Sequence, residues 1–474
     1  MSSPVNPGYS PLAQTTRRVL RTNLSDLPAL FAEWMSDDLI QHPLPNTRRR
    51  PFTRAVVFWL FLSQCLTRSQ PCREVVRKLL AWLCLCRRVT ISENTSAYCQ
   101  ARQQKLSETF LRDTHQAIVA RIESQAPATA RWRGQRVGVV DGTTISMPDT
   151  PRNQADYPQP SEQKTGCGFP VMKIVGVFSL ATGLWHLLAY GHLRNHERIL
   201  FHQLWDEVCR RFDILLGDRG FTSFADMYLL KQRGVDTVLR RHQMRASDFR
   251  KGKRLGHNDH LVAWKKPAQR PDWLSQDVYA AMPEEWIVRE IKVLVAVNGF
   301  RTRVYVIVTT LLDPVLYPPS ALAELYFLRW SVEIRFRDIK CTLGLDVLRC
   351  KSPAMVQKEL WMLVIAHNLI RALLLKAARR AGQPLARLSF KGTVDTLRQW
   401  APLLAAFARQ PALYRRLCRH FIACIAHDLV PFRPERMEPR AKKRRLQLSA
   451  FNQTPSPHGQ LAPSQSPSPK AEKP

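Results

Sequence analysis

The chain has 474 residues, which is enough for two or three domains with full hydrophobic cores. Its 71 lysines and arginines outnumber its 38 acidic residues and give a formal charge of +33. A charge this high exceeds what solubility requires, so it indicates a polyanionic partner. Because the cations are spread along the whole chain, nucleic acid fits better than the surface of an anionic membrane.

Membrane insertion and secretion are disfavoured by the sequence. No apolar run reaches the length that a bilayer requires, and the nearest candidate, Ala55–Leu62, is bounded by Arg54 and Gln64. The N-terminus lacks the apolar core of a signal peptide, so we expect a cytosolic protein. None of the eleven cysteines forms a C-x-x-C pair, and we expect them to be reduced and packed.

The first 130 residues have helical patterns and exposed arginines. We assign 1–130 to a helical N-terminal domain that binds DNA, with a dimerisation or packing domain as the alternative. No recognition helix can be identified within it. The predicted helices are Ser25–Met35, Thr53–Leu66, Cys72–Cys84 and Ala101–Ser124.

From residue 131 the pattern changes to strands followed by helices, which predicts a mixed sheet with helices on its faces. The stretch Arg136–Ser146 reads as a strand that leads to Asp141 and then to a turn of small residues. Asp218 follows a short buried strand, Asp213–Gly217. Further strands are predicted at Val171–Leu180, Trp185–Gly191 and Thr237–Arg240, with a Thr182-Gly183 hairpin turn and helices at Glu197–Arg211 and Ala225–Arg233.

Asp141 and Asp218 are therefore both predicted at strand ends. A single acid in such a position is commonly a turn former or a helix cap. Strand ends are also where ligands bind in sheets of this kind. Three acids placed to converge in a very basic chain favour the ligand-binding interpretation; the third is Glu333, in the helix described below.

Residues 244–316 read as a β-rich insertion. Two long alternating strands, Glu285–Val297 and Arg301–Thr310, are predicted to join at Asn298-Gly299. Trp264, Trp273 and Trp286 lie among basic residues and could stack on unpaired bases. For any single tryptophan, a place in the core of the insertion is the favoured interpretation.

The stretch Leu325–Leu343 predicts one helix with a buried apolar stripe. At about 100° per residue, four polar residues of this helix fall within an arc of roughly 60°. An ordinary amphipathic helix with ion pairs is the alternative. The four residues are Tyr326, Arg329, Glu333 and Lys340.

The C-terminal part is predicted to be helical and then disordered. Trp361–Arg380 is a strongly apolar helix, and Leu403–Ala426 adds further helix. We assign 383–430 to a helical region that could dimerise. Residues 431–474 combine a basic run with Pro/Ser repeats, which is typical of a disordered tail.

These motifs together resemble bacterial insertion-sequence transposases of the DDE class. Tyr326, Arg329, Glu333 and Lys340 match the YREK signature Y-x2-R-x3-E-x6-K without a gap. Asp141 in VVDGTT and Asp218 in LLGDRGF resemble the two aspartates of that class. The resemblance covers roughly residues 131–381. It implies a mixed α+β fold: an RNase H-like core at 131–243 and 317–382, interrupted by the β-rich insertion, with helical N- and C-terminal regions.

The resemblance also implies a chemistry. Cleavage of a phosphodiester requires stabilised charge on the attacking and leaving oxygens, which two Mg²⁺ ions held by carboxylates supply. We expect Asp141, Asp218 and Glu333 to bind these ions, with Mn²⁺ as a possible substitute. The expected partners are double-stranded DNA, as transposon-end inverted repeats and target, and a second copy of the chain in a synaptic complex.

The remaining residues of the signature would bind DNA. Tyr326, Arg329 and Lys340 are expected to contact phosphates near the transposon end. The expected reaction is cleavage at the transposon end followed by strand transfer, with a hairpin intermediate as in relatives.

Two alternatives remain open from the sequence. One is a stand-alone metal-dependent nuclease or resolvase on the same sheet, and the other is a non-catalytic DNA-binding protein. A zinc site at His192 and His196 lacks a third ligand, and the chain has no phosphate-binding loop for ATP.

Overall fold

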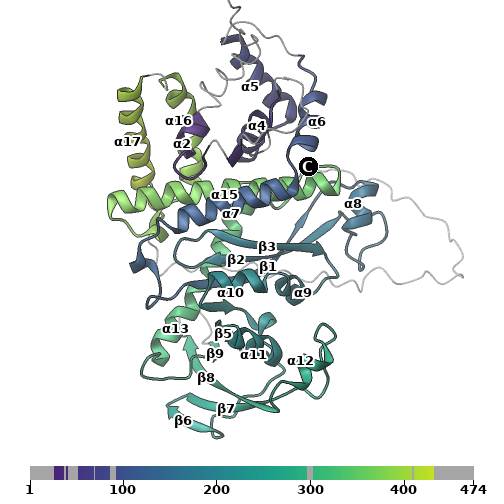
Figure 1. Ribbon diagram of the computed structural model, residues 1–474, viewed down its shortest axis with the longest axis vertical. Coiled ribbons are helices and arrows are strands. Elements are labelled where there is room, and N and C mark those ends of the chain that lie inside the picture. Colours follow the sequence, from purple (N-terminus) through teal and green to yellow (C-terminus); the bar gives the residue numbers. More distant parts are fainter. Residues whose placement is uncertain are drawn as a thin grey trace, which may run out of the picture. The chain divides into compact units, whose positions relative to one another are not determined.

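The structure is a computed structural model that describes residues 26–36, 39–40, 52–68, 70–85, 92–295, 303–407 and 410–431. The predicted Asn298-Gly299 turn lies outside the described residues, and so does the tail from 432 onward. Figure 1 shows the arrangement of the elements.

The described strands form one mixed sheet in the order β3-β2-β1-β4-β5-β9-β8-β7-β6. β2 is antiparallel to β1 and β3, whereas β4 is parallel to β1 and β5. The order 3-2-1-4-5 with these directions is that of an RNase H-like core, which confirms the expected fold class. The strands are β1 (Val137–Ser146), β2 (Val171–Ser179), β3 (Trp185–His192), β4 (Ile214–Gly217), β5 (Asp236–Arg240), β6 (Lys253–Gly256), β7 (Asp259–Lys265), β8 (Glu285–Val295) and β9 (Arg303–Thr309).

β1 differs from its predicted form because it does not end at Asp141. Its pairing with β2 continues to Ser146, so the predicted turn after Asp141 is wrong. Its described pairing with β4 stops at Val139, opposite Leu216. The small residues after Asp141 therefore extend the strand along β2.

The insertion strands continue the core sheet. β9 pairs antiparallel with β5, and β8, β7 and β6 follow outward. Inside the insertion, the buried Arg289 guanidinium lies 2.6 Å from the Asp259 carboxylate and also donates to the Tyr317 carbonyl at 2.8 Å. This buried pair ties the insertion to the segment that leads into the next core helix.

The three tryptophans of the insertion are packing residues in this structure. Trp264 is buried and donates its indole N–H to Glu290 at 2.9 Å. Trp273 packs on His202, and Trp286 packs edge-on against Tyr228. The core interpretation therefore holds for all three.

Helices pack on both faces of the sheet: α15 (Pro353–Ala381) lies on one face, and α9 (Glu197–His202) and α10 (Trp205–Arg211) lie on the other.

Two predicted helices of the first half are divided into two. Ser107 caps a second helix within Ala101–Ser124, and the predicted helix Glu197–Arg211 breaks at Gln203 and Leu204. The helices of the first half are α2 (Asp26–Phe31), α4 (Arg54–Leu66), α5 (Cys72–Leu85), α6 (Ser96–Lys105), α7 (Glu108–Glu123), α8 (Pro151–Asp156), α9 (Glu197–His202), α10 (Trp205–Arg211) and α11 (Phe224–Gln232).

The helices of the second half also differ in part from their predicted bounds. The predicted Leu403–Ala426 helix is divided, and a proline at 411 begins its second part. These helices are α12 (Gln276–Ala280), α13 (Pro319–Leu328), α14 (Ser331–Arg337), α15 (Pro353–Ala381), α16 (Phe390–Ala406) and α17 (Pro411–His427), with a π-helix, η4, at Asp338–Thr342 between α14 and α15.

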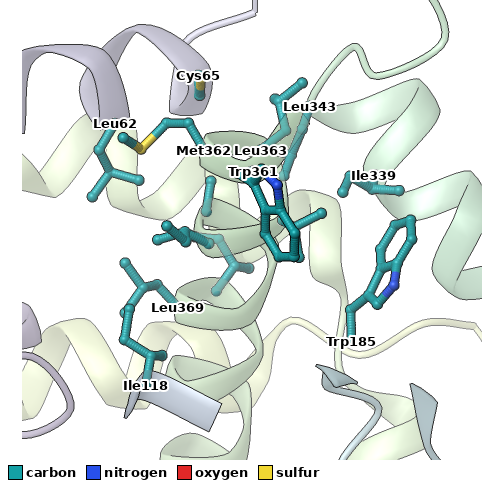
Figure 2. Packing of buried hydrophobic residues seen from close by; sticks show 14 of the residues in the cluster. Leu62, Cys65, Ile118, Trp185, Ile339, Leu343, Trp361, Met362, Leu363 and Leu369 are labelled. Carbon is teal, nitrogen blue, oxygen red and sulfur yellow. The ribbon is translucent and has the colours of Figure 1, made fainter. Parts of the chain in front are cut away.

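α15 is the central helix of the core. Within the described residues it alone is long and apolar enough to cross a membrane, so the expectation that no apolar run reaches that length is wrong. However, 89% of its apolar window is buried in the protein. It runs beside α7 (Figure 1) and also contacts α4 and α17. Leu62 of α4, Ile118 of α7 and Trp185 of β3 gather around it (Figure 2). α15 is therefore a core helix that joins the N-terminal helices to the sheet.

A buried polar cluster reinforces this junction. Asn368 of α15 accepts from the Trp185 backbone N–H and donates to its carbonyl, both at 2.9 Å. His115 of α7 lies 2.8 Å from the same carbonyl, and His367 lies 3.2 Å from the Asn368 amide oxygen. The other ring nitrogen of each histidine has no hydrogen-bond partner among the described residues. A second proton on either ring would therefore have no acceptor.

These two histidines predict a loss of stability in mild acid. Burial lowers the pKa of His115 and of His367 to about 3. In the unfolded chain a histidine titrates near 6.5, so below about pH 6.5 the unfolded state binds protons that the folded state does not. We expect the free energy of unfolding to fall by roughly 1 kcal/mol per pH unit for each histidine between about pH 6 and 4.

Denaturant unfolding at a series of pH values measures the slope of the free energy of unfolding against pH. H115Q and H367Q are each expected to reduce it, because glutamine does not titrate. H420Q, which changes an exposed histidine, is the matched control and leaves the slope unchanged. An identical slope in all four proteins would contradict the assignment of neutral, buried rings.

Candidate active site

Asp141 and Asp218 lie on two neighbouring central strands of the sheet, at the C-terminal end of β4. β1 and β4 are parallel, and continuing the register from Val139 and Leu216 by two residues sets Asp141 beside Asp218. β4 is buried throughout and ends at Gly217, so Asp218 is the first residue beyond it. The sheet therefore brings the two aspartates together where β4 ends.

The segment with the other predicted residues is not the single helix that the sequence suggested. α13 ends at Leu328, α14 begins at Ser331, and the chain widens into the π-helix η4 at Asp338–Thr342. At the break, backbone N–H groups bond three residues back: Arg329 to Tyr326, and Glu333 to Trp330. Both changes alter the rotation per residue, so the predicted shared polar arc is wrong.

The four signature residues are accordingly in different environments. Tyr326 and Arg329 are buried, at 1% and 6% exposure, whereas Glu333 is exposed. Lys340 reaches back to β1 and donates to the Thr144 carbonyl at 2.7 Å.

Arg329 is the cation of this site. Its Nη1 lies 3.8 Å from Asp141 Oδ2, and its guanidinium carbon lies 5.7 Å from the centre of the Tyr326 ring. Across the site, Arg240 Nη1 lies 3.9 Å from Asp218 Oδ1. Both aspartates are thus near guanidinium groups, at distances longer than a direct hydrogen bond.

Several buried polar atoms at the site have no hydrogen-bond partner among the described residues. They are Asp218 Oδ1, Tyr326 Oη and Arg329 Nε. Buried polar atoms of this kind call for a ligand, an ion or water.

Burial and neighbouring carboxylates both disfavour the ionised form of Asp141. Burial raises the pKa of Asp141 to about 6, against the opposing effects of the Gly142 N–H and the Arg329 guanidinium. The carboxylates of Glu197 and Asp218 raise this pKa further. Like charges gathered around a buried acid disfavour its ionised form.

Glu333 is an exposed residue of α14, a helix that packs against the strand of Asp141. Its helix α14 packs against β1, and two hydrogen bonds hold the following segment there: Lys340 to Thr144, and the Ser146 N–H to the Asp346 carbonyl at 3.1 Å. No contact links the Glu333 carboxylate to either aspartate in the described structure. In the same residues, no three His, Cys, Asp or Glu side chains converge closely enough to hold one ion.

Glu197 lies beside Asp141 along β1, and sequence reasoning did not point to it. It is the first residue of α9, and its carboxylate lies against Gly142, next to Asp141. The sequence contains no signal for this position, because an acid in the first turn of a helix is ordinary.

The donors at this edge fit a divalent cation. Carboxylate oxygens are the ligands that Mg²⁺ and Mn²⁺ prefer. Asp218 Oδ1 has no hydrogen-bond partner among the described residues, and burial together with acidic neighbours disfavours the ionised form of Asp141. A divalent cation would relieve that repulsion.

Comparison with known proteins identifies the family of the chain. A family model described as the transposase DDE domain matches residues 132–369. The chain is 27% identical over 434 residues to transposase InsG of insertion sequence element IS4 from Escherichia coli strain K12, covering 90% of this chain and 92% of that protein. It also overlaps a cryo-EM structure of the piggyBac transposase synaptic complex with hairpin DNA, with a TM-score of 0.43, 12% identity and 88% coverage of each chain. The chain belongs to the transposase DDE domain family and is a DNA transposase.

Proposed function

We propose that this transposase cleaves DNA at the ends of its element and joins them to target DNA at a site made by Asp141, Asp218 and Glu333. The observation that carries the proposal is the parallel register of β1 and β4, which sets the two aspartates side by side with Arg329 beside them. Glu333 stands on a helix that packs on the same strand.

Mg²⁺ is the proposed cofactor, with Mn²⁺ as a substitute. Asp141, Asp218 and Glu333 would hold the ions through their carboxylate oxygens. The bound ions would stabilise charge on the attacking and leaving oxygens of the phosphodiester.

Tyr326, Arg329 and Lys340 are proposed to hold the DNA backbone. Arg329 balances the charge of Asp141 in the DNA-free chain, and its unpaired Nε is available for a phosphate oxygen. The unpaired Tyr326 hydroxyl can donate to a neighbouring phosphate. These contacts position the scissile bond without reading sequence.

The proposed reaction has two steps. Water attacks the phosphorus atom at the transposon end, and the bond to the 3′-oxygen breaks to free a 3′-hydroxyl. That hydroxyl then attacks a second phosphodiester and displaces its 3′-oxygen. Attack on the opposite strand closes a hairpin, and attack on target DNA completes strand transfer.

The remaining assignments follow from this activity. We propose that 1–130 bind the transposon end, that 383–430 contribute to a homodimer which holds two ends, and that the protein acts in the bacterial cytosol on the nucleoid. The competing function is a stand-alone nuclease on the same sheet. A strand-transfer reaction with precleaved ends separates the two, because a nuclease cuts without joining.

Removal of the proposed metal ligands is expected to abolish cleavage. D141N, D218N and E333Q should each lower the rate of cleavage of end DNA by roughly 100-fold or more, because each removes a carboxylate that holds charge-stabilising ions. Binding of end DNA, measured by fluorescence anisotropy, should persist. EDTA should stop the wild-type reaction, and added Mg²⁺ or Mn²⁺ should restore it.

E324Q is the matched control, because Glu324 is an exposed acid on the neighbouring helix α13. It should cleave like the wild type. If E333Q cleaves at the wild-type rate, Glu333 is not part of the site. If D141N and D218N cleave at the wild-type rate, the proposed function is refuted.

The proposed phosphate contacts predict a change in salt dependence. R329A should weaken binding of end DNA and reduce the slope of log Kd against log salt by about one, as expected for one lost phosphate contact. K391A is the control, because Lys391 already pairs with Asp395 at 2.7 Å. Equal slopes for R329A and the wild type would show that Arg329 pairs with Asp141 and contacts no phosphate.

A further inference from the structure

Two cysteines of the N-terminal helices lie in contact with each other. Cys72 is the first residue of α5, and Cys99 lies on α6. The Cys99 thiol donates a hydrogen bond to the Cys72 sulfur. Both residues are free cysteines and both are half-buried. The proposed function uses neither of them.

The side-chain amide of Gln64 is held so that its N–H group meets the Cys72 sulfur. The amide oxygen accepts from the Tyr98 hydroxyl at 3.0 Å and from Arg102 Nη1 at 3.2 Å. The amide nitrogen donates to Cys72 Sγ at 3.7 Å and to the Gln70 carbonyl at 2.9 Å. Because two donors occupy the oxygen, the amide is oriented with its nitrogen toward Cys72.

These surroundings favour the thiolate form of Cys72. The Cys99 thiol, the Arg102 guanidinium and the Gln64 amide together lower the pKa of Cys72 to about 5, against the opposing effect of burial. Cys72 also begins α5, and the N-terminus of a helix favours a negative charge. Cys72 is therefore an anion at neutral pH, and the thiolate is the nucleophilic form of cysteine.

The same contact has the opposite effect on Cys99. The hydrogen bond to Cys72 raises the pKa of Cys99, and burial raises it further. Cys99 thus remains a thiol next to the Cys72 thiolate. In such a pair, oxidation of the thiolate sulfur can be followed by a disulfide with its neighbour.

Cys72 lines a cavity of about 400 Å³. Gln64 and Arg102 line the same cavity from the N-terminal helices, and Cys350 and Glu359 line it from the core. Hydrogen peroxide is only slightly larger than a water molecule, so the cavity has room for it beside the Cys72 sulfur.

The other cysteines of this cavity have a different environment. Cys65 and Cys350 are buried, and burial raises the pKa of both thiols. Both therefore stay protonated at neutral pH. The half-buried Cys72 thus differs from neighbouring cysteines that only pack in the core.

We propose that Cys72 and Cys99 form an oxidisable pair, in which hydrogen peroxide converts Cys72 to a sulfenic acid and Cys99 then closes a disulfide. The Cys72 thiolate attacks one peroxide oxygen, the O–O bond breaks, and the hydroxide that leaves takes a proton from the solvent. The Cys99 sulfur then attacks the Cys72 sulfur, the S–O bond breaks, and the hydroxyl leaves as water with the Cys99 proton. The pair loses two electrons, and the peroxide is reduced to two waters.

The pair lies where the N-terminal helices meet the segment that follows α14. Arg102 Nη2 lies 3.8 Å from Cys350 Sγ, and Arg68 donates to the Cys341 carbonyl in η4 at 3.0 Å. Oxidation removes the negative charge of Cys72 near Arg102 and ties α5 to α6. It involves no residue of the proposed active site, so this inference does not depend on the proposed function.

Mass spectrometry of the full-length protein tests the pair. The reduced protein is treated with a small excess of hydrogen peroxide, the remaining thiols are alkylated, and peptides are analysed over time. We expect the Cys72–Cys99 disulfide to form at least about 10-fold faster than Cys167, an exposed cysteine, is oxidised. Dithiothreitol should restore both thiols.

C99S and C72S separate the roles of the two residues. C99S retains a hydrogen-bond donor but no second thiol, so dimedone should trap a sulfenic acid at Cys72. In C72S, Cys99 should react no faster than Cys167. C418S, which changes another half-buried cysteine, is the matched control and should form the disulfide like the wild type.

Two results in the wild type would overturn the inference. One is oxidation of Cys72 no faster than that of Cys167, and the other is rapid oxidation of Cys72 without a disulfide to Cys99. Both are measured without any substitution, so a variant that fails to fold does not remove the test. Thermal unfolding under reducing conditions checks that each variant is folded.

Discussion

The proposed active site depends on where β4 stops beside β1. The parallel pairing holds Asp141 and Asp218 at one level, and the end of β4 leaves the carboxylates without a neighbouring strand. β1 continues along β2, so the backbone of Asp141 stays fixed by the sheet. Acids are thereby held rigidly at a position that side chains from both faces of the sheet can reach, which is the support that a metal-dependent site needs.

The same arrangement disfavours the ionised form of Asp141, and the nearby Arg329 guanidinium offsets this effect only in part. Burial and the carboxylates of Glu197 and Asp218 raise the pKa of Asp141, and the Arg329 guanidinium at 3.8 Å opposes this effect. The site is thus short of positive charge in an otherwise very basic chain. This local deficit is what the proposed binding of divalent cations would relieve.

Distant parts of the chain keep the site in place. The Asn368 amide joins α15 to β3, and His115 brings α7 to the same carbonyl. On the other side, Arg289 of the insertion holds the segment before α13, the helix that carries Tyr326. The insertion and the N-terminal helices therefore support the catalytic sheet as well as adding surface.

The sequence by itself determined the family, the strands of the core and the identity of the paired aspartates, because these depend on local patterns: β-branched runs, motif spacing and turn residues. It did not predict the break at Arg329, the π-helix after Asp338 or the approach of Glu197. Periodicity assumes one uniform helix, and Glu197 lies far from Asp141 along the chain. Only tertiary packing, which overrides local helix geometry and brings α9 against β1, decided these features.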